Sequence, residues 1–320
     1  MMKPSGPTSR TDGALPDAEA PSGTQIELRL GDQQAYVVEV GGALRAYVTN
    51  AGDRLDGYGR ADRCTGARGQ TFIPWPNRLR HGRYRLGATE HQLPLSEPAR
   101  QNAIHGLVRW ANWSPAEVAA DRARMTYVLH PQPGWPFTLG LSIAYRLDSD
   151  GLSVTTTATN LGSEPCPYGT GAHPYLRLRA PSIDQLQLQA PGSAWMPSDE
   201  HGIPTGLEPV DSTAYDFRRP RTIGSATLDT AYGSLQRDHD GLAWVTLVDP
   251  ATGDGVKLWM DDAYPYLMLF SGDTLPQEDR RRRGLGVEPM SCAPNALQSG
   301  HGLVVIEPGG LHTARWGIRP

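Results

Sequence analysis

LGLSIAYRLDSDGLSVTTTAT, residues 139–159, is the stretch that decides the fold class. Apolar and polar residues alternate through Leu139–Leu147, which is the two-residue period of a strand with one buried face. The DSDG segment then supplies turn residues, and Leu152–Thr159 follows with β-branched side chains that suit a pleated, half-buried surface. The stretch therefore predicts an antiparallel hairpin of two long strands.

The same pattern recurs towards both ends of the chain. Short alternating segments come in pairs, and each pair flanks a glycine-containing turn of the kind that joins hairpin strands. The three predicted hairpins are Ala35–Val40 with Ala43–Val48 around Gly41-Gly42, Trp244–Val248 with Val256–Trp259 around PATGDG, and Leu303–Ile306 with His312–Gly317 around EPGGL.

Helical periodicity is nearly absent, and the best candidate is a short helix over Ser114–Ala123. The 36 glycines and 28 prolines favour frequent turns and disfavour long helices. Many short strands at regular spacing are typical of a large antiparallel sandwich or barrel. We therefore predict an all-β fold built from large antiparallel sheets.

Composition narrows the class of protein. Residues 1–23 contain almost nothing large and apolar, which predicts a disordered tail before a single domain over 24–320. The chain has no signal-peptide h-region, no apolar run of about 20 residues and a net charge of −4, so we expect a cytoplasmic protein that binds neither membranes nor nucleic acids. Its three cysteines, in no CxxC pair, are expected to be inert thiols.

Two segments between predicted strands hold polar groups suited to a sugar. In FIPWPNRLRHGRY, the guanidinium of Arg78 offers a fork of donors, Asn77 both donates and accepts, and Trp75 lies between two prolines. In AIHGLVRWANW, His105 stands near Trp110, an aromatic ring suited to the C–H face of a sugar. Each segment alone fits an ordinary structural loop at least as well.

Two further segments hold an acid–base pair. In YGTGAHPYL, Gly169 and Gly171 allow close backbone approach, and His173 is fixed between alanine and proline. In GVEPMSCAPNAL, Glu288 has apolar neighbours, which would raise its pKa and make it a general base near neutral pH. Motifs of serine hydrolases, zinc proteases and nucleotide-binding proteins are missing from the sequence.

Taken together and in order, these segments resemble the aldose 1-epimerase (galactose mutarotase) family. The resemblance covers about residues 25–320. It is carried by PWPNRLRHGRY, IHGLVRW, GTGAHPYL, LDTAY and VEPMSCAPNAL, with YDFRRPRTIG ahead of LDTAY. It implies the β-supersandwich fold and a cofactor-free, metal-free enzyme that interconverts the α and β anomers of an aldose such as glucose or galactose.

The resemblance also implies a role for each matching residue. Glu288 corresponds to the base that removes the proton of the C1 hydroxyl, His173 to the acid at the ring oxygen, and His105 to an auxiliary histidine. Asn77, Arg78 and Asp229 would hold hydroxyl groups, with Trp75 or Trp110 against the sugar face. One position departs from the family, because Met268 stands where many members carry a substrate-binding glutamine.

Three alternatives stay open at this stage. A hexose-6-phosphate 1-epimerase would need a basic cluster, for which Arg78, Arg80, Arg83 and Arg85 are available. A non-catalytic carbohydrate-binding sandwich would use the same aromatic rings without the acid–base pair. A glycoside-processing enzyme would use Asp229 and Glu288 and leave both histidines without a role. A monomer and a homodimer are both compatible with the sequence.

Overall fold

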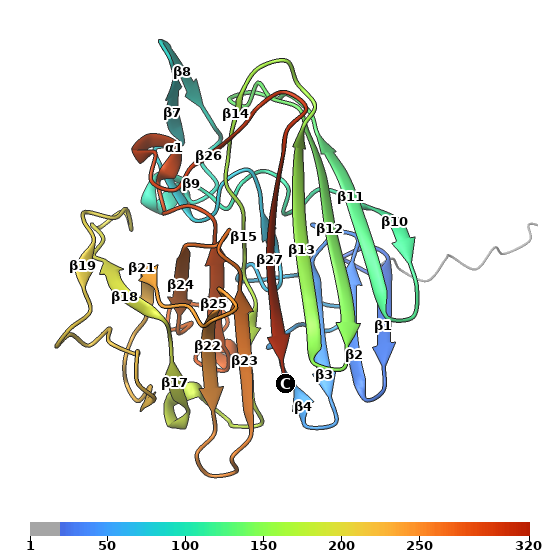
Figure 1. Ribbon diagram of the computed structural model, residues 1–320, viewed down its shortest axis with the longest axis vertical. Coiled ribbons are helices and arrows are strands. Elements are labelled where there is room, and N and C mark those ends of the chain that lie inside the picture. The colour runs from blue at the N-terminus through green and yellow to red at the C-terminus, as the bar shows by residue number, and fades with distance from the viewer. Residues whose placement is uncertain (1–19) are drawn as a thin grey trace, which may run out of the picture.

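The computed structural model describes residues 20–320, and its central feature is the predicted hairpin (Figure 1). Strands β12 (Leu139–Asp148) and β13 (Gly151–Asn160) pair without a register shift from one end to the other. Gly151 closes the turn with φ of +138°, and a Cβ atom there would lie 2.1 Å from the carbonyl oxygen of Ile318. Glycine is therefore required at this position.

This hairpin forms the middle of a nine-stranded sheet. The order is β10-β11-β12-β13-β27-β23-β22-β17-β20, with antiparallel pairing throughout. The other bounds are β10 Ser114–Val118, β11 Arg122–Leu129, β27 Leu311–Arg319, β23 Gly255–Met260, β22 Ala243–Val248, β17 Gln187–Gln189 and β20 Arg221–Thr222.

A second large sheet, of eight strands, lies behind β22 and β23 in Figure 1. Its order is β19-β18-β21-β24-β25-β15-β5, with β16 also paired to β25. The bounds are β19 Glu208–Pro209, β18 Gly192–Met196, β21 Asp229–Leu235, β24 Tyr266–Phe270, β25 Leu285–Met290, β15 Gly171–Ala172, β5 Thr71–Phe72 and β16 Tyr175–Leu176.

Smaller elements complete the structure. A four-stranded sheet contains β1 Gln25–Leu30, β2 Gln33–Val38, β3 Leu44–Thr49 and β4 Gly52–Asp53. Two-stranded ribbons pair β14 Cys166–Tyr168 with β26 Val304–Ile306, β6 Arg78–Arg80 with β9 Asn102–Ile104, and β7 Arg83–Leu86 with β8 Thr89–Gln92. Single turns of helix are η1 Pro98–Arg100, η2 Ile183–Gln185, η3 Glu278–Arg280 and α1 Ala296–Ser299.

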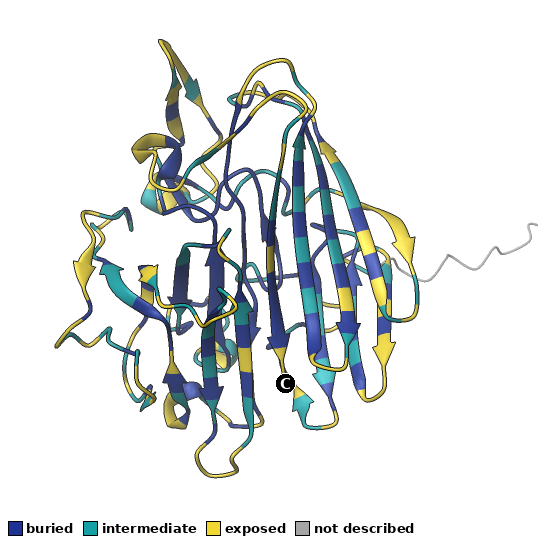
Figure 2. Ribbon diagram, viewed as in Figure 1, coloured by how far each residue is buried: buried dark blue, intermediate teal, exposed yellow. Residues whose placement is uncertain are grey.

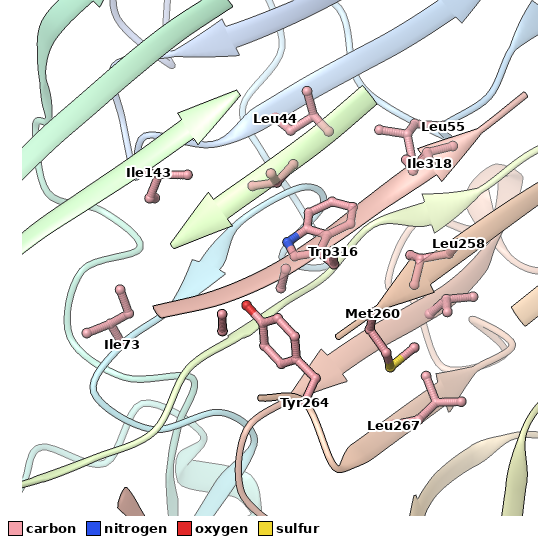
Figure 3. Close-up of a cluster of buried hydrophobic side chains, with 14 of the residues drawn as sticks. Leu44, Leu55, Ile73, Ile143, Leu258, Met260, Tyr264, Leu267, Trp316 and Ile318 are labelled. Carbon is pink, nitrogen blue, oxygen red and sulfur yellow. The ribbon is translucent and has the colours of Figure 1, made fainter. Parts of the chain in front are cut away.

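The sheets pack face to face through one apolar cluster. Buried residues alternate with more exposed ones along β12, as the banding in Figure 2 shows. Figure 3 shows Trp316 and Leu258 of the nine-stranded sheet in the same cluster as Leu267 of the eight-stranded sheet and Leu44 of the small sheet. The predicted all-β sandwich of large antiparallel sheets is therefore confirmed.

The predicted hairpins at 35–48 and 244–259 are present as β2–β3 and β22–β23. The hairpin predicted for Leu303–Ile306 and His312–Gly317 is wrong, because β26 pairs with β14 while β27 pairs with β13 and β23. The alternation of apolar and polar residues identified the correct strands there, but a turn sequence does not determine which strand pairs with which. Each of the two strands pairs instead with strands distant in the sequence.

The predicted helix over Ser114–Ala123 is also wrong. These residues form the edge strand β10, a turn and the start of β11, with a register shift between Pro115 and Glu117. Every residue of β10 is exposed, so no apolar stripe exists to hold a helix against the core. A proline near the start of an edge strand is tolerated because its missing N–H faces away from the sheet.

The predicted tail lies mostly outside the described residues. Within residues 20–320, Cys64, Cys166 and Cys292 are free and buried. In the same range, no helix combines the length and the apolar character needed to cross a bilayer.

Candidate active site

Glu288 lies near the middle of the eight-stranded sheet, on a strand whose six residues are all buried. Its strand, β25, has neighbours on both sides. Met268 of β24 lies directly opposite Glu288, and on the other edge β15 and β16 pair with β25 in succession. The carboxylate is therefore held on a rigid element, which favours a defined orientation.

His173 meets Glu288 because the backbone on either side of it pairs with the same strand. Gly171 pairs with Met290 and Tyr175 with Gly286, so His173 lies across from Glu288. The imidazole Nε2 is 3.2 Å from Oε1 of Glu288, and both side chains are nearly fully buried. The second carboxylate oxygen, Oε2, is buried without a hydrogen-bond partner among residues 20–320.

Burial dominates the electrostatics of this pair. Burial, reinforced by the charge of Asp229 and opposed by Arg78, raises the pKa of Glu288 well above its usual value. Burial, and then the positive charges of Arg68 and Arg109, lower the pKa of His173 to about 3. Desolvation therefore favours the uncharged form of each group, in which the proton that the pair shares lies on the carboxylate.

His105 and Asn77 fix each other. The backbone N–H of Asn77 donates to Nδ1 of His105 at 3.2 Å, and the N–H of His105 donates to the Asn77 carbonyl at 3.0 Å. Both residues have positive φ, +54° for Asn77 and +63° for His105. Because Nδ1 accepts a hydrogen bond, the neutral ring carries its proton on Nε2, which faces the cavity as a donor.

Arg78 links three elements around the cavity. Its Nε and Nη2 donate to the carboxylate of Glu97 at 3.0 and 3.2 Å, and Nη2 is 3.7 Å from Asp229. Asp229 also lies 3.7 Å from Arg100. The sequence analysis did not single out Glu97, which sits between predicted elements without a motif of its own.

Two side chains, Tyr175 and then Arg68, stack in succession behind His173. Its ring is parallel to that of Tyr175 at 4.6 Å between centroids, and the guanidinium of Arg68 lies 4.8 Å from the Tyr175 ring. Arg68 is held in turn by Asp56, with Nε 3.2 Å from the carboxylate, and both are buried. Tyr175 belongs to the predicted GAHPYL segment, but its position behind His173 follows from the alternating strand and could have been inferred from that.

One cavity of about 610 Å³ joins these groups, a size typical of small-molecule sites. Seven of the eight predicted site residues line it: Asn77, Arg78, His105, Trp110, His173, Asp229 and Glu288. The prediction for Trp75 is not supported, because its ring is 2% exposed and packs in the apolar core away from the cavity lining. Met268 also lines the cavity, so an apolar side chain faces the site there.

His105, His173 and Glu288 have potential metal-ligand atoms within 4.8 Å of one another. Three such atoms could reach a single ion. The surroundings oppose this, because burial and then the charges of Arg109, His173 and Arg78 lower the pKa of His105 well below its usual value. The same positive field disfavours a divalent cation, so the absence of a metal requirement stays a prediction.

The all-β fold and the buried acid–base pair together point to one class of protein, a carbohydrate epimerase. The chain belongs to the aldose 1-epimerase family, whose profile matches residues 24–319. The family resemblance seen in the sequence is thereby confirmed.

Two relatives show the similarity in sequence. The uncharacterized protein YihR of Escherichia coli K12 is 36% identical to this chain over 293 residues, which are 91% of each chain. The galactose mutarotase of Mus musculus is 29% identical over 161 residues, which are 48% of this chain and 46% of the mouse protein.

Solved structures share the fold. A GalM/aldose epimerase homologue from Caenorhabditis elegans has a TM-score of 0.81 at 15% identity, over 92% of this chain and 98% of its own. The galactose 1-epimerase of Lactobacillus acidophilus has a TM-score of 0.76 at 21% identity, over 92% and 93% of the two chains.

Proposed function

We propose that the chain is an aldose 1-epimerase that interconverts the α and β anomers of an aldose by opening and closing its ring. The observation that carries this proposal is the contact between His173 and Glu288, a buried acid–base pair 3.2 Å apart that lines the cavity of a chain from this family. A carbohydrate-binding protein would have no use for such a pair.

The reaction needs two proton transfers. The unpaired Oε2 of Glu288 takes the proton of the C1 hydroxyl, while Nε2–H of His173 protonates the ring oxygen O5. The C1–O5 bond breaks and its electron pair stays on oxygen, which leaves an aldehyde at C1. Rotation about C1–C2 presents the other carbonyl face, and the ring closes as both protons return.

The shared proton links this scheme to the electrostatics. The working form has an ionised Glu288 and a protonated His173, whereas burial favours the neutral form with the proton on Glu288. The two forms hold the same number of protons and interconvert across the 3.2 Å contact. A bound sugar favours the ionised form, because its C1 hydroxyl donates to the carboxylate and its ring oxygen accepts from the imidazole.

The remaining groups hold the sugar in place. Nε2–H of His105, the amide of Asn77 and the carboxylate of Asp229 are hydrogen-bonding partners for ring hydroxyls, and Arg78 donates from the same wall. Trp110, 51% exposed at the cavity, offers an aromatic face for the C–H side of the ring. No step in this scheme uses a cofactor, so none is proposed.

Polarimetry of freshly dissolved α-D-glucose and α-D-galactose tests the proposal. Purified protein should speed the decay of optical rotation, and Glu288→Gln should lower kcat by roughly 10²- to 10⁴-fold. Glu117→Gln, the same change on the exposed edge strand β10, is the matched control and should leave the rate unchanged. Near-normal turnover by a folded Glu288→Gln protein would remove Glu288 from the mechanism.

A further inference from the structure

Asp229 is a cavity-lining carboxylate that stands between two arginines without a hydrogen bond to either. It is the first residue of β21 and is exposed at the cavity. Nη2 of Arg78 and Nη1 of Arg100 each lie 3.7 Å from Oδ2 of Asp229, which is too long for a hydrogen bond. The carboxylate oxygens of Asp229 therefore keep lone pairs free to accept from a ligand.

The gap between Arg78 and Asp229 needs a physical cause. Arg78 is only 8% exposed, and a guanidinium withdrawn from water gains most from carboxylates at hydrogen-bond distance. Its opposite charge attracts it to Asp229, yet the contact stops short of a hydrogen bond. Another group must hold the guanidinium back.

Glu97 holds Arg78 from the other side. Nε and Nη2 of Arg78 donate to the Glu97 carboxylate at 3.0 and 3.2 Å, the paired geometry in which arginine binds a carboxylate most strongly. Glu97 is itself fixed by the buried Asn102, whose Nδ2 donates to Oε2 at 3.1 Å. The backbones of Glu97 and Asn102 also bond to each other in both directions, at 2.9 and 3.2 Å. The orientation of the Glu97 carboxylate is therefore set by side chain and main chain together.

Gly202 limits the movement of Arg78 on a third side. Nδ2 of Asn102 also donates to the carbonyl of His201 at 2.8 Å, which ties the loop that carries Gly202 to the same cluster. Gly202 has φ of +73°, and a Cβ atom there would lie 2.9 Å from Nη1 of Arg78. The loop backbone therefore packs directly against the guanidinium, and an Arg78 released by its partner has Asp229 as the neighbouring carboxylate within reach.

We infer that Glu97 is a positioning residue that holds Arg78 away from Asp229 and so keeps the Asp229 carboxylate open to sugar hydroxyls. The inference rests on the proposed function, in which Asp229 accepts hydrogen bonds from the sugar. A movement of about 1 Å would turn the 3.7 Å contact into a hydrogen bond of ordinary length. Arg78 would then occupy lone pairs that the sugar needs.

Crystal structures of Glu97 variants test the geometry without any sugar. Glu97→Gln keeps the shape of the side chain and one carbonyl acceptor but removes the charge that attracts the guanidinium. Glu97→Ala removes the acceptor as well. In both variants Nη2 of Arg78 should close to about 2.7–2.9 Å from Asp229. An Arg78 that keeps its present distance from Asp229 in both variants would overturn the inference.

Anomer-exchange kinetics separate a positioning role from a purely structural one. The probe is D-glucose or D-galactose, whichever the wild type turns over faster. Glu97→Gln should raise KM roughly 5- to 20-fold and leave kcat within about threefold, because the lost hydrogen bond holds the sugar in ground and transition states alike. Glu90→Gln, the same change at an exposed residue of β8 outside the cavity, should change neither constant.

A double-mutant cycle shows whether Glu97 acts through Asp229. Asp229→Asn should itself raise KM, and adding Glu97→Gln to it should change KM by less than about twofold, because the acceptor that Glu97 protects is already altered. If the two increases in KM multiply instead, Glu97 contacts the sugar directly or only stabilises the fold, and the inference is overturned.

The outcomes keep the inference and the proposed function apart. A normal KM in a folded Glu97→Gln protein that still turns over the sugar would overturn the inference and leave the proposed function standing. Acceleration of neither sugar by the wild type would count against the proposed function. The crystal structures would then decide the geometric claim alone, since movement of Arg78 onto Asp229 supports it and an unmoved Arg78 refutes it.

Discussion

Nε2 of His173 lies 3.2 Å from Oε1 of Glu288, and the two groups depart from their usual pKa values in opposite directions. A lowered histidine pKa and a raised glutamate pKa both favour the form in which the one shared proton of the pair lies on the carboxylate. Such a pair can accept a proton at one oxygen of a sugar and deliver a proton at another without exchange with water.

The first prediction concerns pH. The active form is the singly protonated pair, which gains a second proton only as the pH falls towards the His173 pKa of about 3 and loses its proton as the pH rises through the raised pKa of Glu288. The acid limb of kcat/KM therefore lies far below the usual histidine value of 6.5. Polarimetry with glucose, which does not titrate in this range, should show no loss of kcat/KM between about pH 7 and pH 5. A tenfold fall per pH unit below 6.5 would contradict the assignment.

The second prediction concerns the stack behind His173. Tyr175→Phe keeps the parallel ring 4.6 Å away and loses only the hydrogen bond of the hydroxyl to Gly66, so kcat should stay within about threefold of wild type. Tyr175→Leu removes the ring that orients the imidazole, and kcat should fall by roughly 10- to 100-fold with a smaller change in KM. Equal kcat values for the two variants, both folded by circular dichroism, would show that the stack has no positioning role.

Whether a contact in this structure could be predicted from the sequence depends on how far apart its two residues are along the chain. The β12–β13 hairpin could be predicted because alternation and a DSDG turn are local signals. The partners of β26 and β27 could not, since pairing with strands as distant in sequence as β13, β14 and β23 leaves no mark in the turn between β26 and β27.

The site follows the same rule. Segment order and residue type indicated His173 and Glu288, but their contact depends on β15 and β16 both pairing with β25. The sequence did not reveal that Trp75 lies outside the cavity lining, because composition does not tell a ring that faces a cavity from one that packs into the core. Arg109 also lines the cavity, and the sequence analysis did not single it out. The signal that could have found it is a charged residue in the apolar AIHGLVRWANW segment, next to a tryptophan.

The arginine-rich stretch QEDRRRRG has a structural role that its composition does not reveal. A solvated surface turn is the ordinary expectation for such a stretch, yet Arg280 and Arg283 reach the buried carboxylate of Asp56 at 3.2 and 3.3 Å. Arg68 and Arg177 contact the same carboxylate at 3.2 and 3.1 Å. One buried carboxylate therefore ties this stretch to the loop that supports Tyr175.

The third prediction follows from this cluster. Asp56→Ala leaves the buried Arg68 without its counter-charge and should lower the free energy of unfolding by about 3–5 kcal/mol. Asp150→Ala is the matched control, because its carboxylate is 67% exposed and pairs with Arg319 at 3.6 Å. The control should cost no more than about 1 kcal/mol. Urea unfolding of the three proteins measures both values, and similar midpoints for Asp56→Ala and wild type would show that the cluster does not stabilise the fold.

The fourth prediction concerns metal. His105, His173 and Glu288 could reach one ion, but Arg78 and Arg109 lower the proton affinity of His105, and a divalent cation would meet the same repulsion. The acid–base scheme also needs both His173 and Glu288 free to exchange protons, which a metal on those atoms would prevent. Prolonged dialysis against EDTA should therefore leave kcat and KM unchanged, and added Zn²⁺ should not raise kcat. Loss of activity on dialysis with recovery on adding Zn²⁺ would instead make these three residues a metal centre and replace the proton-transfer mechanism proposed above.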